Sequence, residues 1–471
     1  MALSLVAAYN SSAIIAAANR PEIRLFQVAR EGSMAPLPAL LNYTTGYPGN
    51  PGNPTGTAPT WTPATPRSVP QFSGVCYLTA LHLQNIQHGG DRGAVYGLID
   101  SAVGSTDVQS WMAKEARASA LKTCWTPSNA TALPPSHSHA PNNATEASEL
   151  WNAMIYPLVP FGLSAVLWDQ GENNAQYCTE PEYSCLFTSM IRHWRAEFGD
   201  IALPAAWVQI GGYAMDIYDE GGAALNSVIR YAQGDSLPAG TDQVFNNHTA
   251  ARFALPVSAM APTFDLGSPQ NATNCDLHPA TATCWWIHCR NKTEVGRRLA
   301  LQLAHVWTAP GGAALAAESE WSGPTVASTE VRLDAATHTP YALVSFAHAA
   351  GLALLPAQGC FHCCNQTGPG PKGTVASKSP PLFELANRRG TWLPAVAGHV
   401  DTESGTVRVT PNCDLRPAAC EVTCKSPDEC WLASVRYAQV DVPQCALYND
   451  AELPAQQFSF PVPWSRGAEQ Y

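Results

Sequence analysis

Short apolar segments alternate with amphipathic helical patterns along this chain, and that alternation most constrains its fold. Four apolar runs end at glycine, proline or polar turns and are predicted to be buried strands: 94–99, 164–168, 206–210 and 255–260. Apolar residues recur at helical spacing along 187–198, before Gly199, and along 295–306. Asn291 and Glu294 resemble a capping box ahead of the second helix. The alternation predicts an α/β fold with a parallel sheet.

The pattern changes after about residue 318. Short β-like segments follow at 329–333, 341–346 and 406–409, and eight of the 15 cysteines lie between residues 360 and 445. We therefore predict two domains. The first is an α/β domain over residues 1–317, with an exposed Gly/Pro-rich insertion at 45–70, and the second is a β-rich, Cys-rich region over 318–471.

Charge and hydropathy exclude two classes of protein. Only 13% of the 471 residues are charged, and 37 acidic against 26 basic residues give a net charge of −11. A nucleic-acid-binding protein normally carries a basic patch or stripe, and the sequence has no run rich in Lys or Arg. Membrane insertion is not expected either, because no apolar stretch approaches the roughly 18–20 residues that span a bilayer.

Cysteine usage and glycosylation motifs indicate an oxidising compartment. Fifteen cysteines favour disulfides over zinc, because the cluster Cys360, His362, Cys363 and Cys364 has no second half at zinc spacing. Eight Asn-x-Ser/Thr acceptor sites accompany them: Asn10, Asn42, Asn129, Asn143, Asn247, Asn271, Asn291 and Asn365. Together they predict a secreted, lysosomal or lumenal glycoprotein. Since residues 1–19 lack the basic start of a signal peptide, we expect the beginning to be missing.

Three polar clusters follow predicted strands, where parallel α/β sheets bind ligands. They occupy residues 104–107, 170–174 and 265–288. These clusters contain a glycine, an asparagine and histidines, which are the groups that an acyl-transfer site needs. A glycine amide and a carboxamide can donate to a developing oxyanion. A histidine can take a proton from a hydroxyl nucleophile and return it to the leaving alcohol.

Several blocks, in order along nearly the whole chain, resemble the sialate O-acetylesterases, which are carbohydrate esterases of the SGNH-hydrolase fold. Residues 168–174, Trp-Asp-Gln-Gly-Glu-Asn-Asn, resemble the family's Trp-Tyr-Gln-Gly-Glu-Ser-Asn block. Residues 104–106 resemble its Gly-Gly-Thr block, and residues 287–292 resemble its Ile-His-Pro-Arg-Asn-Lys helix start. Residues 151–157, 435–438, 447–449 and 453–455 add further matches.

The resemblance implies a three-layer parallel sheet and removal of O-acetyl groups from sugars, sialic acids among them, without a metal or organic cofactor. By position, Gly104 and Asn174 would complete the oxyanion hole and His288 would be the general base. Asp265 would orient the histidine. Trp168 and Gln170 would line the substrate pocket.

The histidine assignment has an alternative. Residues 276–279, Asp-Leu-His-Pro, resemble the family's Asp-Ile-His-Pro, so His278 competes with His288 as the base. We favour His288 because it directly precedes the Arg-Asn-Lys helix start. No aspartate lies three residues before His288, where many SGNH enzymes place it, so the role of Asp265 rests on position alone.

The nucleophile is not found among the matching blocks. Residues 1–5 resemble the family sequence that begins at the Met of Gly-Gln-Ser-Asn-Met, which places the serine before Met1. Ser4 is expected within a helix, and Ser236, in a Gly-Asp-Ser-Leu sequence, is expected within a turn. We therefore expect the 471-residue chain to be an N-terminally truncated, inactive esterase. The alternative is a non-catalytic carbohydrate-binding pseudoenzyme that retains the cleft.

Overall fold

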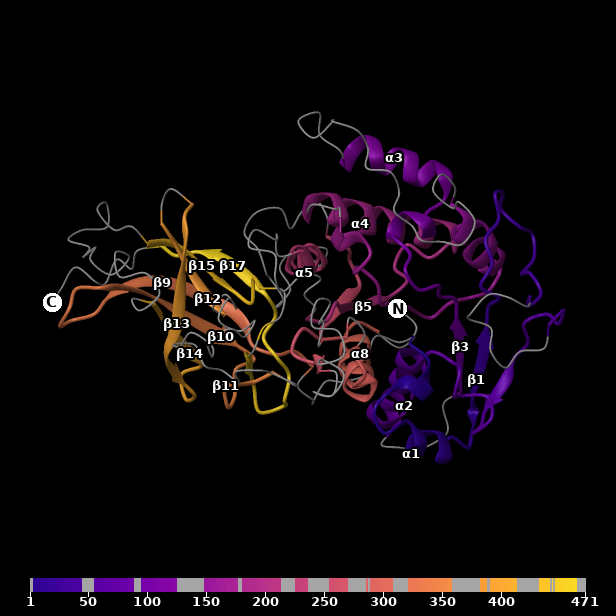
Figure 1. Ribbon diagram of the computed structural model, residues 1–471, viewed down its shortest axis with the longest axis horizontal. Coiled ribbons are helices and arrows are strands. Elements are labelled where there is room, and N and C mark those ends of the chain that lie inside the picture. Colours follow the sequence, from indigo (N-terminus) through magenta and orange to yellow (C-terminus); the bar gives the residue numbers. More distant parts are fainter. Residues whose placement is uncertain are drawn as a thin grey trace, which may run out of the picture. The chain divides into compact units, whose positions relative to one another are not determined.

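The computed structural model (Figure 1) describes residues 3–44, 55–88, 95–124, 148–176, 180–212, 225–235, 254–269, 285–286, 289–307, 321–357, 382–387, 390–412, 432–440, 443 and 445–463. The chain forms two compact units. The first comprises Met1–Ile210, Leu255–Ala261 and His288–Trp321, and the second comprises Gly211–Ala254, Pro262–Ile287 and Ser322–Tyr471. No helix among the described residues is long and apolar enough to cross a membrane. The predicted domain boundary at residue 317 stays a prediction.

Parallel strands organise the first unit. Strand β1 (Arg20–Gln27) runs parallel to β3 (Tyr96–Asp100) and antiparallel to the short β2 (Thr62–Ala64). A second sheet has the order β4 (Val166–Trp168), β5 (Ala205–Gln209) and β6 (Ser258–Pro262), with β4 and β5 parallel. Each of the four predicted buried strands overlaps β3, β4, β5 or β6. The α/β class with parallel strands is therefore confirmed.

The helices of the first unit are η1 (Leu5–Ala7), α1 (Ser11–Ala16), α2 (Gly74–His88), η2 (Val108–Trp111), α3 (Lys114–Cys124), η4 (Trp151–Ile155), η5 (Tyr156–Leu158), η6 (Asn174–Gln176), α4 (Glu180–Glu197) and α8 (Lys292–Val306). The predicted start of α8 is confirmed, because the Asn291 side chain accepts a hydrogen bond from the Glu294 amide at 3.3 Å. Helices α2 and α8 approach closely at Gly296, where an added Cβ would lie 2.9 Å from the Leu78 backbone.

Two predictions about irregular segments are corrected by the structure. Residues 62–64 of the expected 45–70 insertion form β2, and Ala64 and Val69 are buried. The short strand was missed because its Gly/Pro-rich surroundings carry no alternating pattern. Gly234 and Asp235, expected in a turn, instead end helix α5 (Leu225–Asp235), because the preceding residues 225–233 already form a helix. Ser236 lies outside the described residues.

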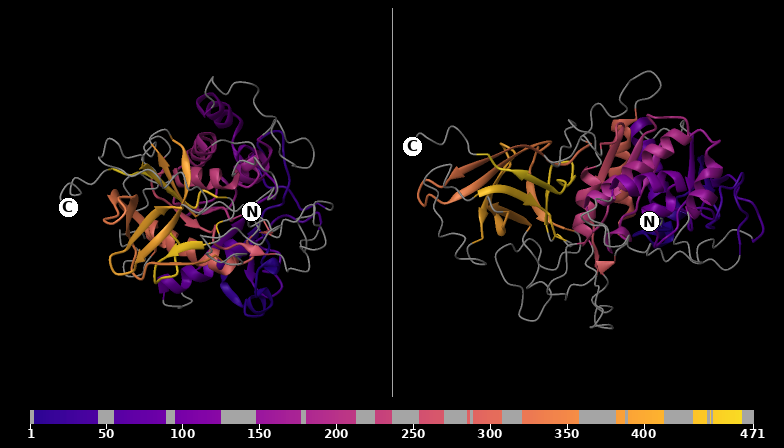
Figure 2. Two further views of the ribbon diagram at one scale, coloured as in Figure 1. Left: turned by 60° about the vertical axis from the view of Figure 1, so that its left-hand side comes forward. Right: turned by 90° about the horizontal axis from the view of Figure 1, so that it is seen from above.

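The second unit is dominated by an antiparallel sheet, seen from two further directions in Figure 2. Its seven strands have the order β17-β15-β12-β13-β14-β10-β9. Their bounds are β9 Thr325–Leu333, β10 Pro340–Ala347, β12 Phe383–Asn387, β13 Trp392–Asp401, β14 Thr406–Pro411, β15 Leu432–Tyr437 and β17 Phe458–Pro461. Two further pairs are β11 (Ala353–Pro356) with β16 (Cys445–Tyr448) and β7 (Ser268–Pro269) with β8 (Trp285–Trp286). The predicted β-rich C-terminal region is confirmed.

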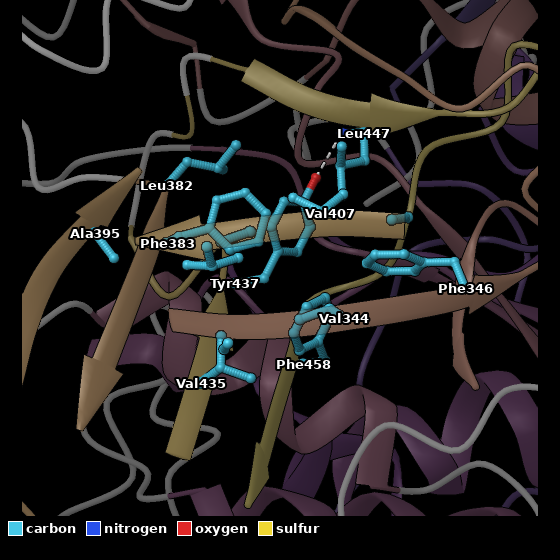
Figure 3. Packing of buried hydrophobic residues seen from close by; sticks show 14 of the residues in the cluster. Val344, Phe346, Leu382, Phe383, Ala395, Val407, Val435, Tyr437, Leu447 and Phe458 are labelled. Carbon is cyan, nitrogen blue, oxygen red and sulfur yellow. Dashed lines mark hydrogen bonds between the residues drawn. The ribbon is translucent and has the colours of Figure 1, made fainter. Parts of the chain in front are cut away.

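Aromatic side chains form the centre of the second unit's core (Figure 3). The Tyr437 ring lies 5.1 Å from Phe383 and stacks on Phe458 at 5.2 Å, measured between ring centroids. Its hydroxyl accepts a hydrogen bond from the Leu447 amide at 2.8 Å, and burial raises the pKa of Tyr437. Because the one polar atom of this ring has a partner, Tyr437 can be fully buried.

Candidate active site

Asn174 is the centre of a buried hydrogen-bond network at the ends of β3 and β4. The residue is fully buried and begins η6, after the loop that follows β4. Its Oδ1 accepts hydrogen bonds from the Val108 amide at 3.0 Å and from Gln170 Nε2 at 2.7 Å. Its Nδ2 donates to Gln109 Oε1 at 2.9 Å. These bonds join the block after β4 to the block after β3, as the strand-end rule predicts.

Gln170 extends the same network in two directions. Its Nε2 also donates to the Thr106 carbonyl at 3.1 Å, so one side chain contacts both strand-end blocks. The Tyr183 hydroxyl of α4 lies 3.1 Å from the Gln170 carbonyl and 3.2 Å from its Oε1. Gln170 is therefore held by groups from two other segments, and only 9% of it is exposed.

Gly104 and Ser105 form an exposed turn directly after β3. An added Cβ at Gly104 would have no atom within 4 Å, so the turn presents open backbone. Ser105 has a φ of +59°, in the left-handed region that favours glycine. It occupies the position of the second glycine in the family's Gly-Gly-Thr block. The turn thus keeps a glycine-type backbone even though the residue is serine.

Buried hydrogen bonds of the two residues that follow this turn fix its backbone. Thr106 Oγ1 donates to the Val103 carbonyl at 2.9 Å and accepts from Trp111 Nε1 at 3.1 Å. Asp107 caps η2 by accepting from the Ser110 amide at 3.1 Å and the Ser110 hydroxyl at 2.6 Å. Such a network fixes the backbone before any ligand binds, which is the preorganisation that an oxyanion site requires.

Trp168 lies at the end of β4 within an aromatic cluster. Its ring makes edge contacts with Trp111, at 6.1 Å, and with Trp194, at 5.8 Å between centroids. The Trp194 indole in turn donates to the Trp111 carbonyl at 3.0 Å. Only 9% of Trp168 is exposed, so most of its ring packs against these buried aromatic side chains. Its predicted contact with substrate stays a prediction.

A buried ion pair connects the β4 loop to the start of α8. Lys292 Nζ lies 3.4 Å from Asp169 Oδ2, and Lys292 is only 4% exposed. Burial is the largest single influence on the Asp169 carboxyl and opposes its ionisation, but the attraction of its cationic neighbours, Lys292 foremost, together with hydrogen bonding lowers the pKa of Asp169. Burial also opposes the Lys292 charge, and the attraction of Asp169 raises the Lys292 pKa above its usual range. A lysine in the first turn faces the positive end of the helix dipole, so this pairing compensates an unfavourable position.

Glu172 lies in the same loop, and its pKa is shifted in the opposite direction. Burial raises the pKa of Glu172, and the Asp169 charge adds to the rise. The pKa values of Asp169 and Glu172, three residues apart, are thus shifted in opposite directions. Pairs of titratable groups with such opposite shifts are often found at functional sites.

In the second unit, Asp265 is fully buried. Its Oδ2 accepts a hydrogen bond from the Tyr448 hydroxyl of β16 at 2.6 Å. Tyr448 belongs to the block 447–449 that resembles the family's closing sequence. One carboxylate oxygen of Asp265 is therefore held in place by the C-terminal β region, and this contact was not predicted from the sequence.

Both candidate bases, His288 and His278, lie outside the described residues. Ser4 was expected within a helix but precedes η1 and forms an isolated β-bridge with Ser73, which ties its backbone to the segment before α2. Within the described ranges, no group of three or more His, Cys, Asp or Glu side chains is arranged to hold a metal ion.

Sequence reasoning also missed Gln109, Tyr183 and the pairing of Asp169 with Lys292. The Gln109 and Tyr183 contacts join segments far apart in the chain, and no local pattern marks them. A signal existed for the ion pair. Asp169 occupies the position at which the family block has a tyrosine. A carboxylate at a buried strand end needs a partner of opposite charge, so a nearby cation could have been predicted.

Comparison with known proteins shows which solved structures and families this chain is similar to. The crystal structure of a carbohydrate acetylesterase from Xanthomonas citri matches 98% of this chain and 78% of that chain, with a TM-score of 0.64 and 24% identity. This chain therefore shares its fold with that protein. Residues 71–252 match the family model "Carbohydrate esterase, sialic acid-specific acetylesterase".

Curated relatives agree with this family. The sialate O-acetylesterases of Pongo abelii and Homo sapiens are 28% and 27% identical to this chain over 399 residues, which is 82% of this chain. The chain spans 60% of the length of each of these relatives. The resemblance predicted from the motifs is confirmed, because this chain is similar to the sialate O-acetylesterases over most of its length.

Proposed function

We propose that the protein is a carbohydrate O-acetylesterase that removes acetyl groups from O-acetylated sugars, sialic acids or related ones. The observation that carries the proposal is the network around Asn174, which joins the two strand-end blocks that the resemblance assigns to the oxyanion hole. The proposed architecture is the three-layer SGNH arrangement, of which the parallel strands form the central layer.

In the proposed reaction, a serine hydroxyl attacks the acetyl carbonyl. Its proton passes to the histidine base, His288 or alternatively His278, and then to the sugar oxygen as the ester bond breaks. Water then hydrolyses the acetyl-serine by the same proton route. The Gly104 amide and Asn174 Nδ2 would donate to the oxyanion at both steps. An amide nitrogen carries two hydrogens, and the bond of one of them to Gln109 Oε1 fixes the orientation of the Asn174 carboxamide.

Asp265 is proposed to orient the histidine. The Tyr448 hydroxyl holds one of its carboxylate oxygens at 2.6 Å, and the proposal assigns the other oxygen to the imidazole. A carboxylate in this role keeps the correct tautomer of the base and stabilises the imidazolium that forms. Tyr448 would then act on the base through Asp265, as a positioning residue.

The nucleophilic serine is predicted to lie outside the 471 residues, and this prediction has a direct test. We would express the 471-residue chain and the product of the full-length transcript, and measure acetate release from 9-O-acetyl-N-acetylneuraminic acid. The proposal expects turnover only where a Gly-Gln-Ser-Asn segment is present, because losing the nucleophile of a serine hydrolase costs about a million-fold in turnover. Binding without acetate release from the full-length product would favour the pseudoenzyme alternative.

A secreted, lysosomal or lumenal location is also proposed, with N-glycans on exposed acceptor sites. Asn10 and Asn42 are exposed and accessible to glycosylation. Asn291 is half-buried, and its side chain caps α8, so the same sequence motif has a structural use there. Enzymatic removal of N-glycans from the secreted protein should lower its mass, and substitution of Asn10 or Asn42 by Gln should remove one glycan each.

A further inference from the structure

The sheet β2-β1-β3, whose strands β1 and β3 are labelled in Figure 1, has two faces of different character. Alternate residues of a strand point to opposite faces. Ile23 and Leu25 of β1 point into an apolar core. Arg24 and Phe26 therefore share the other face, opposite Pro63 and Trp61 in the antiparallel register with β2. Arg24, Trp61 and Pro63 are exposed, so this second face is open to a ligand.

Three aromatic side chains on this face form an aromatic ledge, defined as Phe26, Trp61 and Phe161. The Phe26 ring lies 5.1 Å from Trp61 and 6.2 Å from Phe161, tilted by 45° and 49°. Phe26 is 6% exposed and acts as the floor, whereas Trp61 is 43% exposed and Phe161 is 38% exposed. Exposed rings grouped around a buried one mark a binding surface more often than single exposed residues do.

The Trp61 ring packs against the backbone of a glycine. A Cβ added at Gly97 of β3 would meet the Trp61 ring at 3.1 Å, closer than such contacts normally allow. The glycine therefore leaves room for the indole beside the strand. Gly97 is the register partner of Arg24 on β1, so the indole packs on the strand position that pairs with Arg24.

Arg24 gives the ledge a charge. Among the described residues, no carboxylate lies within ion-pair distance of its guanidinium, although the chain carries a net charge of −11. A guanidinium binds a carboxylate through two parallel hydrogen bonds. The exposed aromatic faces carry negative potential and attract the polarised C–H groups on one side of a sugar ring. Aromatic faces beside a cation therefore fit an anionic sugar.

We propose that the aromatic ledge and Arg24 form a binding subsite for a sialic-acid-type sugar. The ring C–H face would stack on Trp61 and Phe161, and the carboxylate would pair with Arg24. The choice of sugar rests on the proposed function. The register of β1 with β3 relates this subsite to the candidate active site. Phe26 pairs with Ile99, which lies one residue before the end of β3 and five residues before Gly104.

The test uses N-acetylneuraminic acid and its methyl ester, neither of which carries an O-acetyl group. Binding therefore does not depend on hydrolysis, and failure of the esterase proposal would not change the result. We would measure Kd by calorimetry for the 471-residue protein, for Trp61→Ala and for Arg24→Gln. Ile201→Ala is the matched control, because Ile201 is 85% exposed and lies in the loop after α4.

The expected result is that Trp61→Ala raises Kd about tenfold for both ligands, which corresponds to about 1.4 kcal/mol. The acid should bind several-fold more tightly than the ester, and Arg24→Gln should abolish that preference. Ile201→Ala should leave both affinities unchanged. If Trp61→Ala does not fold, Phe161→Ala replaces it with the same expectation. Absence of binding to the unmodified protein, or equal binding after Trp61→Ala or Phe161→Ala, would overturn the proposal.

Discussion

The strand-end loops of the first unit and the antiparallel sheet of the second are held by different forces. The loops after β3 and β4 depend on directional hydrogen bonds between buried amides, centred on Asn174 and Gln170. The sheet core depends on the packing of rings such as Phe383, Tyr437 and Phe458. A directional network fixes atoms in place and loses function when one bond is removed, whereas a packed core tolerates changes that conserve volume.

The largest loss of stability is expected from truncating the sheet core. Phe383→Ala removes a fully buried ring beside Tyr437 and should lower the free energy of unfolding by about 3–5 kcal/mol. Urea denaturation followed by circular dichroism measures the change. Phe383→Leu is the control that keeps most of the volume and should cost much less. Equal losses for both variants would show that packing volume does not govern this unit.

Breaking the ion pair of the first unit should be similarly costly. Lys292→Met leaves the Asp169 carboxylate buried without its cation, and breaking such a pair costs about 3–5 kcal/mol. The double variant Asp169→Asn with Lys292→Met removes both charges and should recover most of the loss. If the double variant is as unstable as Lys292→Met, then lost packing, and not the orphaned charge, is the cause.

The same pair predicts a dependence of stability on pH. The pKa of Asp169 is lowered in the folded protein, so its contribution is present above the unfolded value of about 3.9 and is lost as pH falls towards the folded pKa. Asp169→Asn should therefore destabilise the protein at pH 7 and much less at pH 3. Glu172 has a raised pKa, so Glu172→Gln should act in the opposite sense and stabilise the protein more at pH 7 than at pH 3. Denaturation midpoints at both pH values test both signs.

The sequence predicted those features that depend on local patterns. The Asn291 cap and the apolar stripe of α8 lie within one stretch of chain, so spacing alone identified them. The strand-end rule for ligand sites pointed to the Gly104 and Asn174 blocks, although β3 and β4 lie in different sheets. The Gln109 contact with Asn174 joins residues 65 positions apart, and the Tyr448 contact with Asp265 joins residues 183 positions apart. Such contacts depend on tertiary packing, and no periodicity in the sequence encodes them.

A smaller and more selective effect is expected at Tyr448. Tyr448→Phe removes a hydrogen bond to the buried Asp265 and should cost about 1–3 kcal/mol. In the product of the full-length transcript it should also raise the pKa seen in the pH profile of kcat/KM, because a carboxylate without this donor holds the protonated base more strongly. Tyr437→Phe is the matched control, because the Tyr437 hydroxyl accepts its hydrogen bond from the Leu447 backbone amide. A profile shifted equally by both variants would contradict the positioning role.

The smallest effect is expected in the turn after β3. Ser105→Gly relieves the left-handed conformation, while glycine loses more freedom on folding, so the net gain should be about 0.5 kcal/mol. Ala102→Gly, in the same loop without a positive φ, should instead lower stability slightly. Thermal melting of the two variants separates relief of strain from a general effect of glycine.

The central claim is that the Asn174 network forms the oxyanion site of an esterase. The most direct test is acetate release from 9-O-acetyl-N-acetylneuraminic acid by the product of the full-length transcript, with and without Asn174→Ala. The account predicts turnover that falls about 100- to 1,000-fold in the variant, as when one oxyanion donor is lost, and no change in an Ile201→Ala control. Full activity in folded Asn174→Ala, or no acetate release from the unsubstituted protein, would contradict it.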